Sequence, residues 1–281
     1  MTVLITAAEL AQALSESSPV HVLDVRWTVA APDGRAAYLA GHIPGAVYVD
    51  LDTELSDHSV TGRGRHPLPT PAVLERAARR WGLNPDAPVV VYDDWSGQAA
   101  ARAWWLLRAA GLTDVRILDG GWAAWQRAQQ PTATGDVDPQ PGTLVIDTLG
   151  HLPTVDADTV AAQAISGTNL VLDARAAARY RGDEEPLDPR AGHIPGALSA
   201  PTVDNLASEG VFMPAADLRN RFAALGVGNE PVTVYCGSGV TATHQIAALA
   251  IAGFDAVLYP GSWSEWSNQP GRAVATGPEP R

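Results

Sequence analysis

The second half of this chain repeats the first half. Four short motifs occur twice, in the same order and at a slowly drifting offset: Leu-Asp24-Val-Arg26 and Leu-Asp173-Ala-Arg175, Ala-Gly-His42-Ile-Pro-Gly-Ala and the same letters around His193, Val-Tyr92 and Val-Tyr235, and Trp122-x-x-Trp125 and Trp263-x-x-Trp266. A constant order with a drifting offset is the pattern left by a duplicated domain whose loops have changed length. The sequence therefore predicts two copies of one domain.

Each copy alternates between buried strands and helices. Runs rich in β-branched residues at 20–26, 88–93 and 232–235 predict strands, and helix-favouring segments follow at 98–110 and from Thr241 onward. Such alternation is typical of a parallel sheet that is covered by helices on both faces. The predicted fold class is α/β, with two tandem domains of this architecture.

The composition changes between the two copies. Residues 127–155 are rich in Gln, Pro, Thr, Gly and Asp, which is typical of a linker. We therefore expect a first domain over residues 1–130, a linker over 131–155 and a second domain over 156–281. The length of the chain suits two domains of ordinary size.

Charge and cysteine content limit the partners and the compartment. The net charge is −12 and the sequence has no long basic run, which argues against nucleic acids and anionic membranes as partners. The chain has one cysteine, which cannot form an internal disulfide, and its first residues lack the pattern of a signal peptide. We therefore expect a protein of the reducing cytoplasm.

The one cysteine, Cys236, lies where a predicted strand meets a predicted helix. Gly237 and Gly239 follow it and permit a tight turn with unusual backbone angles. A loop at this place directs backbone N–H groups and the positive end of a helix dipole at one point, beyond the carboxyl end of a strand where parallel sheets bind ligands. Free cysteines are usually inert core residues, but a core does not require Cys-Gly-Ser-Gly at such a corner. We therefore predict a nucleophilic or sulfur-carrying cysteine, whose reactive form is the thiolate.

The segment Cys-Gly-Ser-Gly-Val-Thr-Ala at 236–242 resembles the active-site loop of the two-domain rhodanese-like sulfurtransferases, and the likeness extends over essentially the whole chain. It is closest to the 3-mercaptopyruvate sulfurtransferases of the mycobacterial type, which have neutral residues after the cysteine where thiosulfate-preferring rhodaneses have Arg and Lys. The resemblance implies that the persulfide of Cys236 is bound by the loop residues Gly237, Ser238, Gly239, Val240 and Thr241.

The first copy differs at the decisive position. When Tyr92 is aligned with Tyr235, Asp93 stands in the place of Cys236, and Asp94 follows it. Two carboxylates would oppose a bound anion, so we expect the first domain to be catalytically silent. Motifs that both copies share cannot explain chemistry that only one copy performs. We therefore expect the histidines of the two Gly-His-Ile-Pro-Gly motifs to have a structural function, which is to fix the turn.

The resemblance implies three further catalytic residues. In the family, a His-x-Leu-Pro stretch in the first half supplies a histidine near the nucleophile, and His66 matches it. An aspartate partners that histidine, and Asp52 is the best match, with Asp50 as a rival. Ser238 would complete a Ser-His-Asp relay.

In the family, two arginines bind the carboxylate of the donor. Arg179, within Arg179-Tyr-Arg181-Gly, matches the first of them. The second follows an Asp/Glu-Pro pair with a spacing that this chain does not keep, so Arg190 is only an approximate equivalent. An arginine fork suits a planar carboxylate, which mercaptopyruvate has and thiosulfate lacks.

The predicted reaction moves sulfane sulfur from 3-mercaptopyruvate to a thiol, a thioredoxin-like dithiol or cyanide through a Cys236 persulfide, and it requires no metal or organic cofactor. Thiosulfate as the main donor is one alternative. A non-catalytic sulfur carrier is another, since it would keep the fold without needing Ser238, His66 and Arg179. A cysteine phosphatase is disfavoured, because that class needs Cys-x5-Arg and Ala242 stands at the arginine position.

Overall fold

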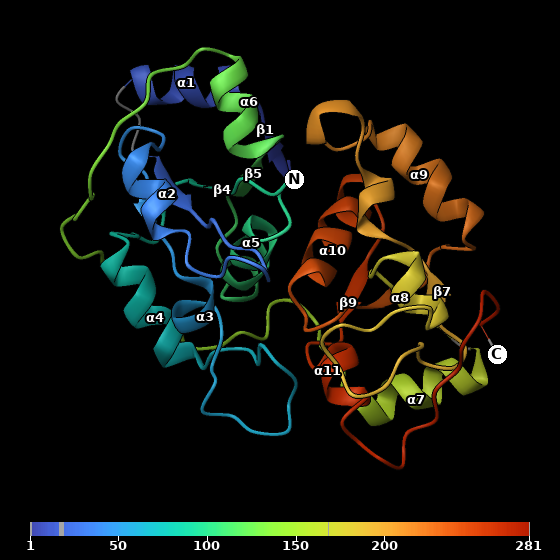
Figure 1. Cartoon of the computed structure of the whole chain (residues 1–281). Helices are drawn as coiled ribbons and strands as arrows, with labels where there is room; N and C mark the ends of the chain where they lie inside the picture. Colours follow the sequence, from blue (N-terminus) through green and yellow to red (C-terminus); the bar gives the residue numbers. More distant parts are fainter. Residues whose placement is uncertain (1, 17–19, 168, 281) are drawn as a thin grey trace. The chain divides into compact units, whose positions relative to one another are not determined.

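The computed structural model describes three stretches of the chain, residues 2–16, 20–167 and 169–280. The outermost ends of the two predicted domains, Met1 and Arg281, lie outside these stretches. The described residues form two compact units, each of which contains one copy of the repeat (Figure 1). Within the described residues, no helix combines the length and the apolar character that a membrane span requires.

The two units do not divide the chain at the linker. The segment His58–Pro67 belongs to the second unit although it comes from the first half of the sequence. Conversely, Ser208–Phe212 belongs to the first unit. Most of the stretch expected to be a linker, up to Leu152, also belongs to the first unit. Relative to the expected domain boundaries, two short segments are therefore exchanged.

The stretch expected to be a linker packs along helix α4 (Pro71–Arg80). The carbonyl of Leu144 accepts a hydrogen bond of 2.9 Å from Arg79 Nε, and the N–H of Ile146 donates one of 2.8 Å to a carboxylate oxygen of Glu75. The side chains of Leu144 and Ile146 are buried. Because polar composition does not prevent a few apolar residues from anchoring a segment, this stretch wraps the first unit.

Five short strands form the sheet of the first unit: β1 (Leu4–Ile5), β2 (His21–Asp24), β3 (Val47–Tyr48), β4 (Val89–Tyr92) and β5 (Val115–Leu118). Their order is β1-β5-β4-β2-β3, and all the hydrogen-bonded pairs among them are parallel. Six helices of this unit lie among the described residues: α1 (Ala7–Ser15), α2 (Arg35–Ala40), α3 (Leu51–Glu54), α4, α5 (Ala100–Ala109) and α6 (Gly121–Arg127). Helix α1 begins with the capping box of Thr6 and Glu9 that its sequence pattern indicates.

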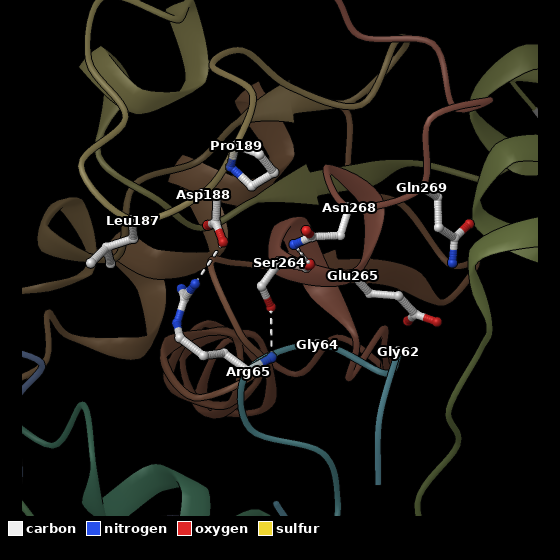
Figure 2. Close-up of a pocket in the computed structure, with 10 residues that line it drawn as sticks. All are labelled: Gly62, Gly64, Arg65, Leu187, Asp188, Pro189, Ser264, Glu265, Asn268 and Gln269. Carbon is white, nitrogen blue, oxygen red and sulfur yellow. Dashed lines mark hydrogen bonds and ion pairs between the residues drawn. The ribbon is translucent and has the colours of Figure 1, made fainter.

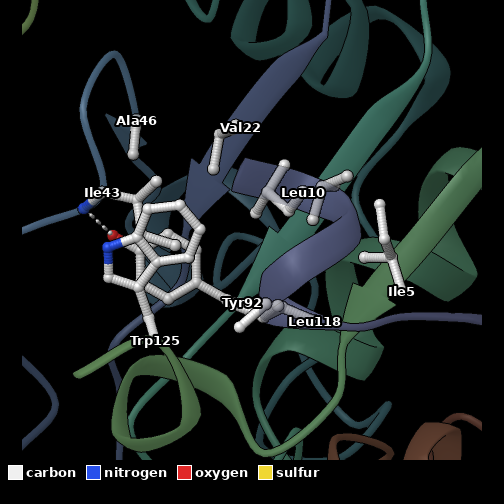
Figure 3. Packing of buried hydrophobic residues seen from close by; sticks show 10 residues of the cluster. Ile5, Leu10, Val22, Ile43, Ala46, Tyr92, Leu118 and Trp125 are labelled. Atoms are coloured by element: carbon white, nitrogen blue, oxygen red, sulfur yellow. Dashed lines mark hydrogen bonds between the residues drawn. The ribbon is translucent and has the colours of Figure 1, made fainter. Parts of the chain in front are cut away.

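Helices cover both faces of this sheet. On one face, Leu10 of α1 and Trp125 of α6 pack with Val22 and Tyr92 of the strands (Figure 3). Alternate strand residues such as Val91 point to the opposite face, where α5 contacts β4 and β5. Both faces are therefore buried, which explains why β4 reads as a continuous apolar run rather than an alternating one.

The second unit repeats this architecture. Its strands are β6 (Val171–Asp173), β7 (Leu198–Ser199), β8 (Val232–Tyr235) and β9 (Ala256–Leu258). They are parallel in the order β7-β6-β8-β9, and a parallel bridge from Thr154 to Leu258 extends the β9 edge as β1 extends the β5 edge of the first sheet. The matching strand orders confirm the predicted duplication and the predicted fold class.

Helices also cover both faces of the second sheet. The helical segments of the second half are α7 (Ala157–Ser166), α8 (Ala177–Arg181), the 3₁₀ turns η1 (Thr202–Asn205) and η2 (Ser208–Gly210), α9 (Ala215–Ala224), α10 (Thr241–Ile251) and α11 (Ser262–Trp266). Helices α7 and α11 share one core cluster with β6 and β8, while α10 packs on β8, β9 and α9. Helix α10 begins at the residue that the sequence pattern indicates.

The repeated motifs hold the framework together in both units. Arg26 donates to both carboxylate oxygens of Asp24 at 2.9–3.1 Å. His42 stacks on Tyr38 with ring centroids 4.3 Å apart, and its Nδ1 lies 2.9 Å from the Tyr38 carbonyl oxygen. The second unit has the same contacts in Arg175 with Asp173 and in His193 with Tyr180. These contacts confirm that both histidines serve the framework.

Candidate active site

Cys236 directly follows β8 and is 1 % exposed. Its N–H donates to Ser262 Oγ at 3.2 Å, and its carbonyl accepts from the N–H of Trp263 at 2.9 Å, so the start of α11 holds its backbone in place. Its Sγ accepts the N–H of Gly239 at 3.1 Å. The sulfur atom therefore lies within the loop that precedes α10, with a backbone donor already directed at it.

The shape of this loop depends on Gly239. Its φ is +79°, a left-handed conformation that favours glycine, and a Cβ there would lie 2.5 Å from the carbonyl oxygen of Pro260. Val240, which precedes α10, makes no side-chain cap. No side chain therefore caps the first N–H groups of α10 at the positive end of the helix dipole, although the N–H of Thr243 donates to the Val240 carbonyl at 3.0 Å.

The matching loop of the first unit contains a carboxylate in place of the thiol. Asp93 is fully buried at the end of β4, and its carboxylate accepts four backbone hydrogen bonds of 2.8–2.9 Å. The donors are the N–H groups of four residues in the same loop: Trp95, Gly97, Ala99 and Ala100. Burial raises the pKa of Asp93, and the four N–H donors oppose that rise.

The two loops use their central glycine in the same way. Gly97 has a φ of +80°, close to the +79° of Gly239, and its N–H donates to Asp93 as that of Gly239 donates to Cys236. From the sequence, the two carboxylates Asp93 and Asp94 are expected to repel an anion from the first loop. Instead, the Asp93 carboxylate is itself the anion that the loop binds. Its occupation of the four N–H groups would explain the expected lack of catalysis in the first domain.

Asp93→Asn is expected to lower the free energy of unfolding by about 2–4 kcal/mol, because the carboxamide NH2 would face two of the four N–H groups and leave them buried without an acceptor. Denaturant titration followed by tryptophan fluorescence measures this change. Asp94→Asn is the matched control, since Asp94 is exposed and adjacent. If both variants unfold at the parent midpoint, the four amides do not depend on the carboxylate.

The structure brings together His66 and Ser238. His66 Nδ1 lies 2.7 Å from Ser238 Oγ, and both residues are buried. The segment that contains His66 is fixed by its neighbours: the N–H of Arg65 donates to Ser264 Oγ at 2.9 Å, and a Cβ at Gly64 would lie 2.5 Å from the carbonyl oxygen of Gly261. Two of the three expected relay residues are therefore in direct contact.

The two rival aspartates lie in the first unit, at the start of α3. The Asp50 carboxylate accepts the N–H groups of Asp52 and Thr53 at 2.9 and 3.1 Å, which makes Asp50 the N-cap of this helix. That structural function leaves Asp52 as the better candidate for the relay. Because Asp52 and His66 belong to different units, their partnership stays a prediction.

The two arginines expected to bind the donor have different surroundings. Arg179 Nη2 lies 2.6 Å from Glu185 Oε1 and 3.3 Å from Asp188 Oδ2. The guanidinium of Arg190 instead donates to four backbone carbonyls that follow or end α11, those of Trp266, Ser267, Gln269 and Arg272. Arg190 thus stabilises the end of a helix. This geometry gives Arg190 a structural function, and the donor site proposed below does not include it.

The structure adds Arg65, for which no sequence motif predicts a role in the site. Arg65 Nη1 lies 2.6 Å from Asp188 Oδ1, so Asp188 lies between Arg65 and Arg179. The signal in the sequence was its position, since Arg65 directly precedes His66 in a segment that the second copy lacks.

Comparison with known proteins identifies the type of domain in each half of the chain. The family model for the rhodanese-like domain matches residues 6–128 and 156–269. SseB of Mycobacterium tuberculosis (strain H37Rv), provisionally named a thiosulfate sulfurtransferase, is 52% identical over 280 residues, which cover 98% of this chain and 97% of that protein. The 3-mercaptopyruvate sulfurtransferase of Escherichia coli (strain K12) is 38% identical over 254 residues, which cover 88% of this chain and 89% of that protein.

A solved structure extends the comparison to the fold. The crystal structure of SseA from Escherichia coli, described as having the rhodanese fold of 3-mercaptopyruvate sulfotransferases, matches with a TM-score of 0.83 at 35% sequence identity. The match covers 94% of this chain and 100% of that chain. Together with the duplicated motifs and the two matching sheets, these findings show that the chain belongs to the rhodanese-like family, as a sulfurtransferase with two rhodanese-like domains.

Proposed function

We propose that this protein transfers sulfane sulfur from 3-mercaptopyruvate to a thiol, a thioredoxin-like dithiol or cyanide, by way of a persulfide on Cys236. The Cys236 thiolate attacks the donor sulfur, the carbon–sulfur bond breaks, and pyruvate leaves as its enolate, which takes up a proton. The acceptor then attacks the outer sulfur and restores the thiolate. Two separate transfers of this kind predict ping-pong kinetics.

The observation that carries the proposal is the contact between His66 and Ser238, two residues beyond the only cysteine. A serine whose hydroxyl is held by a buried histidine is suited to polarise a carbonyl group, which mercaptopyruvate has and thiosulfate lacks. A passive sulfur carrier would have no use for this pair. In the proposed relay, the carboxylate of Asp52 would hold the imidazole of His66 in the required tautomer.

The loop from Gly237 to Thr241 is proposed to stabilise the persulfide anion through its backbone N–H groups. The bond from the Gly239 N–H to Cys236 Sγ supports this, as do the four N–H groups that hold the Asp93 carboxylate in the first unit. Donors that are fixed before the charge develops stabilise it without reorganisation.

A second candidate function uses thiosulfate as the main donor, because the name of the similar SseB protein states that activity. A side-by-side assay of thiocyanate formation from cyanide, with each donor in turn, discriminates between the candidates. The proposal expects a higher kcat/KM with 3-mercaptopyruvate. A higher value with thiosulfate would favour the second candidate, and no turnover with either donor would favour a sulfur carrier.

Arg179→Ala is expected to lower kcat/KM for 3-mercaptopyruvate by roughly 1.5–3 kcal/mol, about 10- to 150-fold, because a charged hydrogen bond to the donor carboxylate is lost. Thiosulfate, which has no carboxylate, should lose less. Steady-state kinetics with both donors measures the difference. Arg181→Ala is the matched control, since Arg181 lies in the same helix and pairs with Asp183 at the surface. Equal losses with both donors would instead make Arg179 a framework residue or a general anion site.

The proposed location is the cytoplasm. Cys236 has to be a free thiol at the start of each turnover, and the cytoplasm keeps thiols reduced. The same compartment supplies the thiol and dithiol acceptors of the proposed second step.

A further inference from the structure

Two guanidinium groups share one buried carboxylate in the second unit. Asp188 Oδ1 lies 2.6 Å from Arg65 Nη1, and Asp188 Oδ2 lies 3.3 Å from Arg179 Nη2. The side chain of Asp188 is 2% exposed, whereas those of Arg65 and Arg179 are 32% and 17% exposed. We refer to these three residues as the arginine–aspartate bridge. The bridge therefore places one buried carboxylate between two cationic groups.

Two members of the bridge, Arg65 and Asp188, line a pocket of about 500 Å³ (Figure 2). In this view Arg65 and Asp188 point toward each other at the pocket wall, and the N–H of Arg65 meets the hydroxyl of Ser264. Glu265 and Asn268 also line the pocket. The space has room for a small molecule, and both polar and apolar groups form its walls.

Part of each guanidinium remains available to a ligand. Among the described residues, Arg65 Nη2 and Arg179 Nη1 make no hydrogen bond, and Arg65 Nε is buried without a partner. Two of these nitrogens meet at the residue that follows the nucleophile: a Cβ at Gly237 would lie 3.4 Å from Arg179 Nη1 and 3.5 Å from Arg65 Nη2. N–H donors that converge beside Cys236 are placed to hold the anionic group of a sulfur donor.

The charges around these donors cancel. Besides Asp188, Arg179 pairs with Glu185, which also contacts Arg175, and Arg175 pairs with Asp173. Each arginine of this group, Arg65, Arg175 and Arg179, thus pairs with at least one carboxylate of the set Asp173, Glu185 and Asp188. The cost of taking an anion out of water rises steeply with its charge, and a site with hydrogen-bond donors but no net positive charge does not repay the extra cost of a dianion.

We infer that Asp188 sets the charge preference of the donor site. Arg65 and Arg179 hold the anionic group of the donor, and Asp188, by cancelling one of their two positive charges, makes the site favour a singly charged donor such as 3-mercaptopyruvate over doubly charged thiosulfate. This inference rests on the proposed function and adds a reason for its choice of donor.

Asp188→Asn tests the inference, because the substitution keeps the shape of the side chain and removes its charge. The ratio of kcat/KM for thiosulfate to kcat/KM for 3-mercaptopyruvate is expected to rise about tenfold or more, since a charge within a few ångströms of a partly buried anion contributes at least that factor. Asp183→Asn is the matched control, because it removes the same charge from an exposed residue of the same segment. Its ratio should stay near that of the parent.

Arg65→Gln provides the opposite change and remains informative if Asp188→Asn does not fold. Removal of a positive charge from the bridge should lower the same ratio about tenfold, with a larger effect on KM than on kcat. The inference is overturned if Arg65→Gln leaves the ratio of the two kcat/KM values unchanged. It is also overturned if Asp183→Asn changes this ratio as much as Asp188→Asn does. Inactivity of the parent protein with both donors would instead refute the proposed function.

Discussion

Cys236→Ser is expected to lose all sulfur transfer, from either donor. The chain has no second cysteine that could carry the sulfur, and a serine hydroxyl does not form the soft anionic nucleophile that attacks sulfur. Thiocyanate formation should fall below detection. Intact-mass spectrometry should find one added sulfur atom in the parent protein after incubation with the donor, and none in the variant.

The fold of the variant must be checked, because Cys236 is buried at the end of β8. An unchanged thermal unfolding midpoint would attribute the loss to chemistry. Appreciable turnover by a folded Cys236→Ser protein would contradict the persulfide mechanism, since no other thiol exists to replace it.

His66→Ala and Ser238→Ala are each expected to slow sulfur transfer from 3-mercaptopyruvate to Cys236 by about 10²–10⁴-fold, the usual contribution of general acid–base catalysis. Thiosulfate should be affected less, because it has no carbonyl group to polarise. The double variant should be little worse than either single variant, since residues that act as one unit are not additive. Single-turnover measurements of persulfide formation give these rates directly.

His58→Ala is the control for this experiment. His58 belongs to the same segment, and its ring centroid lies 5.8 Å from that of His66. Its rate should stay close to that of the parent. The relay would be excluded if His66→Ala formed the persulfide at the parent rate, or if it slowed thiosulfate as much as mercaptopyruvate. A comparison of Asp52→Asn with Asp50→Asn then decides which aspartate takes part.

Most of the fold could be predicted from the sequence because its signals are local. The β-branched run at 232–235 becomes β8 without a change of bounds, and the run at 88–93 becomes β4. Both strands are buried on two faces, and a short, unbroken apolar run bounded by turn residues is typical of such a strand. The capping box at Thr6 and Glu9 is equally local.

The site was less predictable because its contacts are distant in sequence. The ion pair of Arg65 and Asp188 joins residues 123 positions apart, and no spacing rule connects them. Arg190 was chosen by approximate spacing, yet its guanidinium is held by the carbonyls after α11. From the sequence alone the charge of Asp93 predicts repulsion of an anion, because a sequence does not show that four N–H groups surround the carboxylate.

The exchange of segments between the two units has a consequence for how the gene can be divided. Duplicated domains are often separable modules, each of which can be expressed alone. Here the segment His58–Pro67 belongs to the unit that contains Cys236, although this segment comes from the first half of the sequence. A fragment that starts after the linker would keep the nucleophile and lose both Arg65 and His66. The first half of the sequence therefore supplies a segment of the second unit, including two residues of the proposed site.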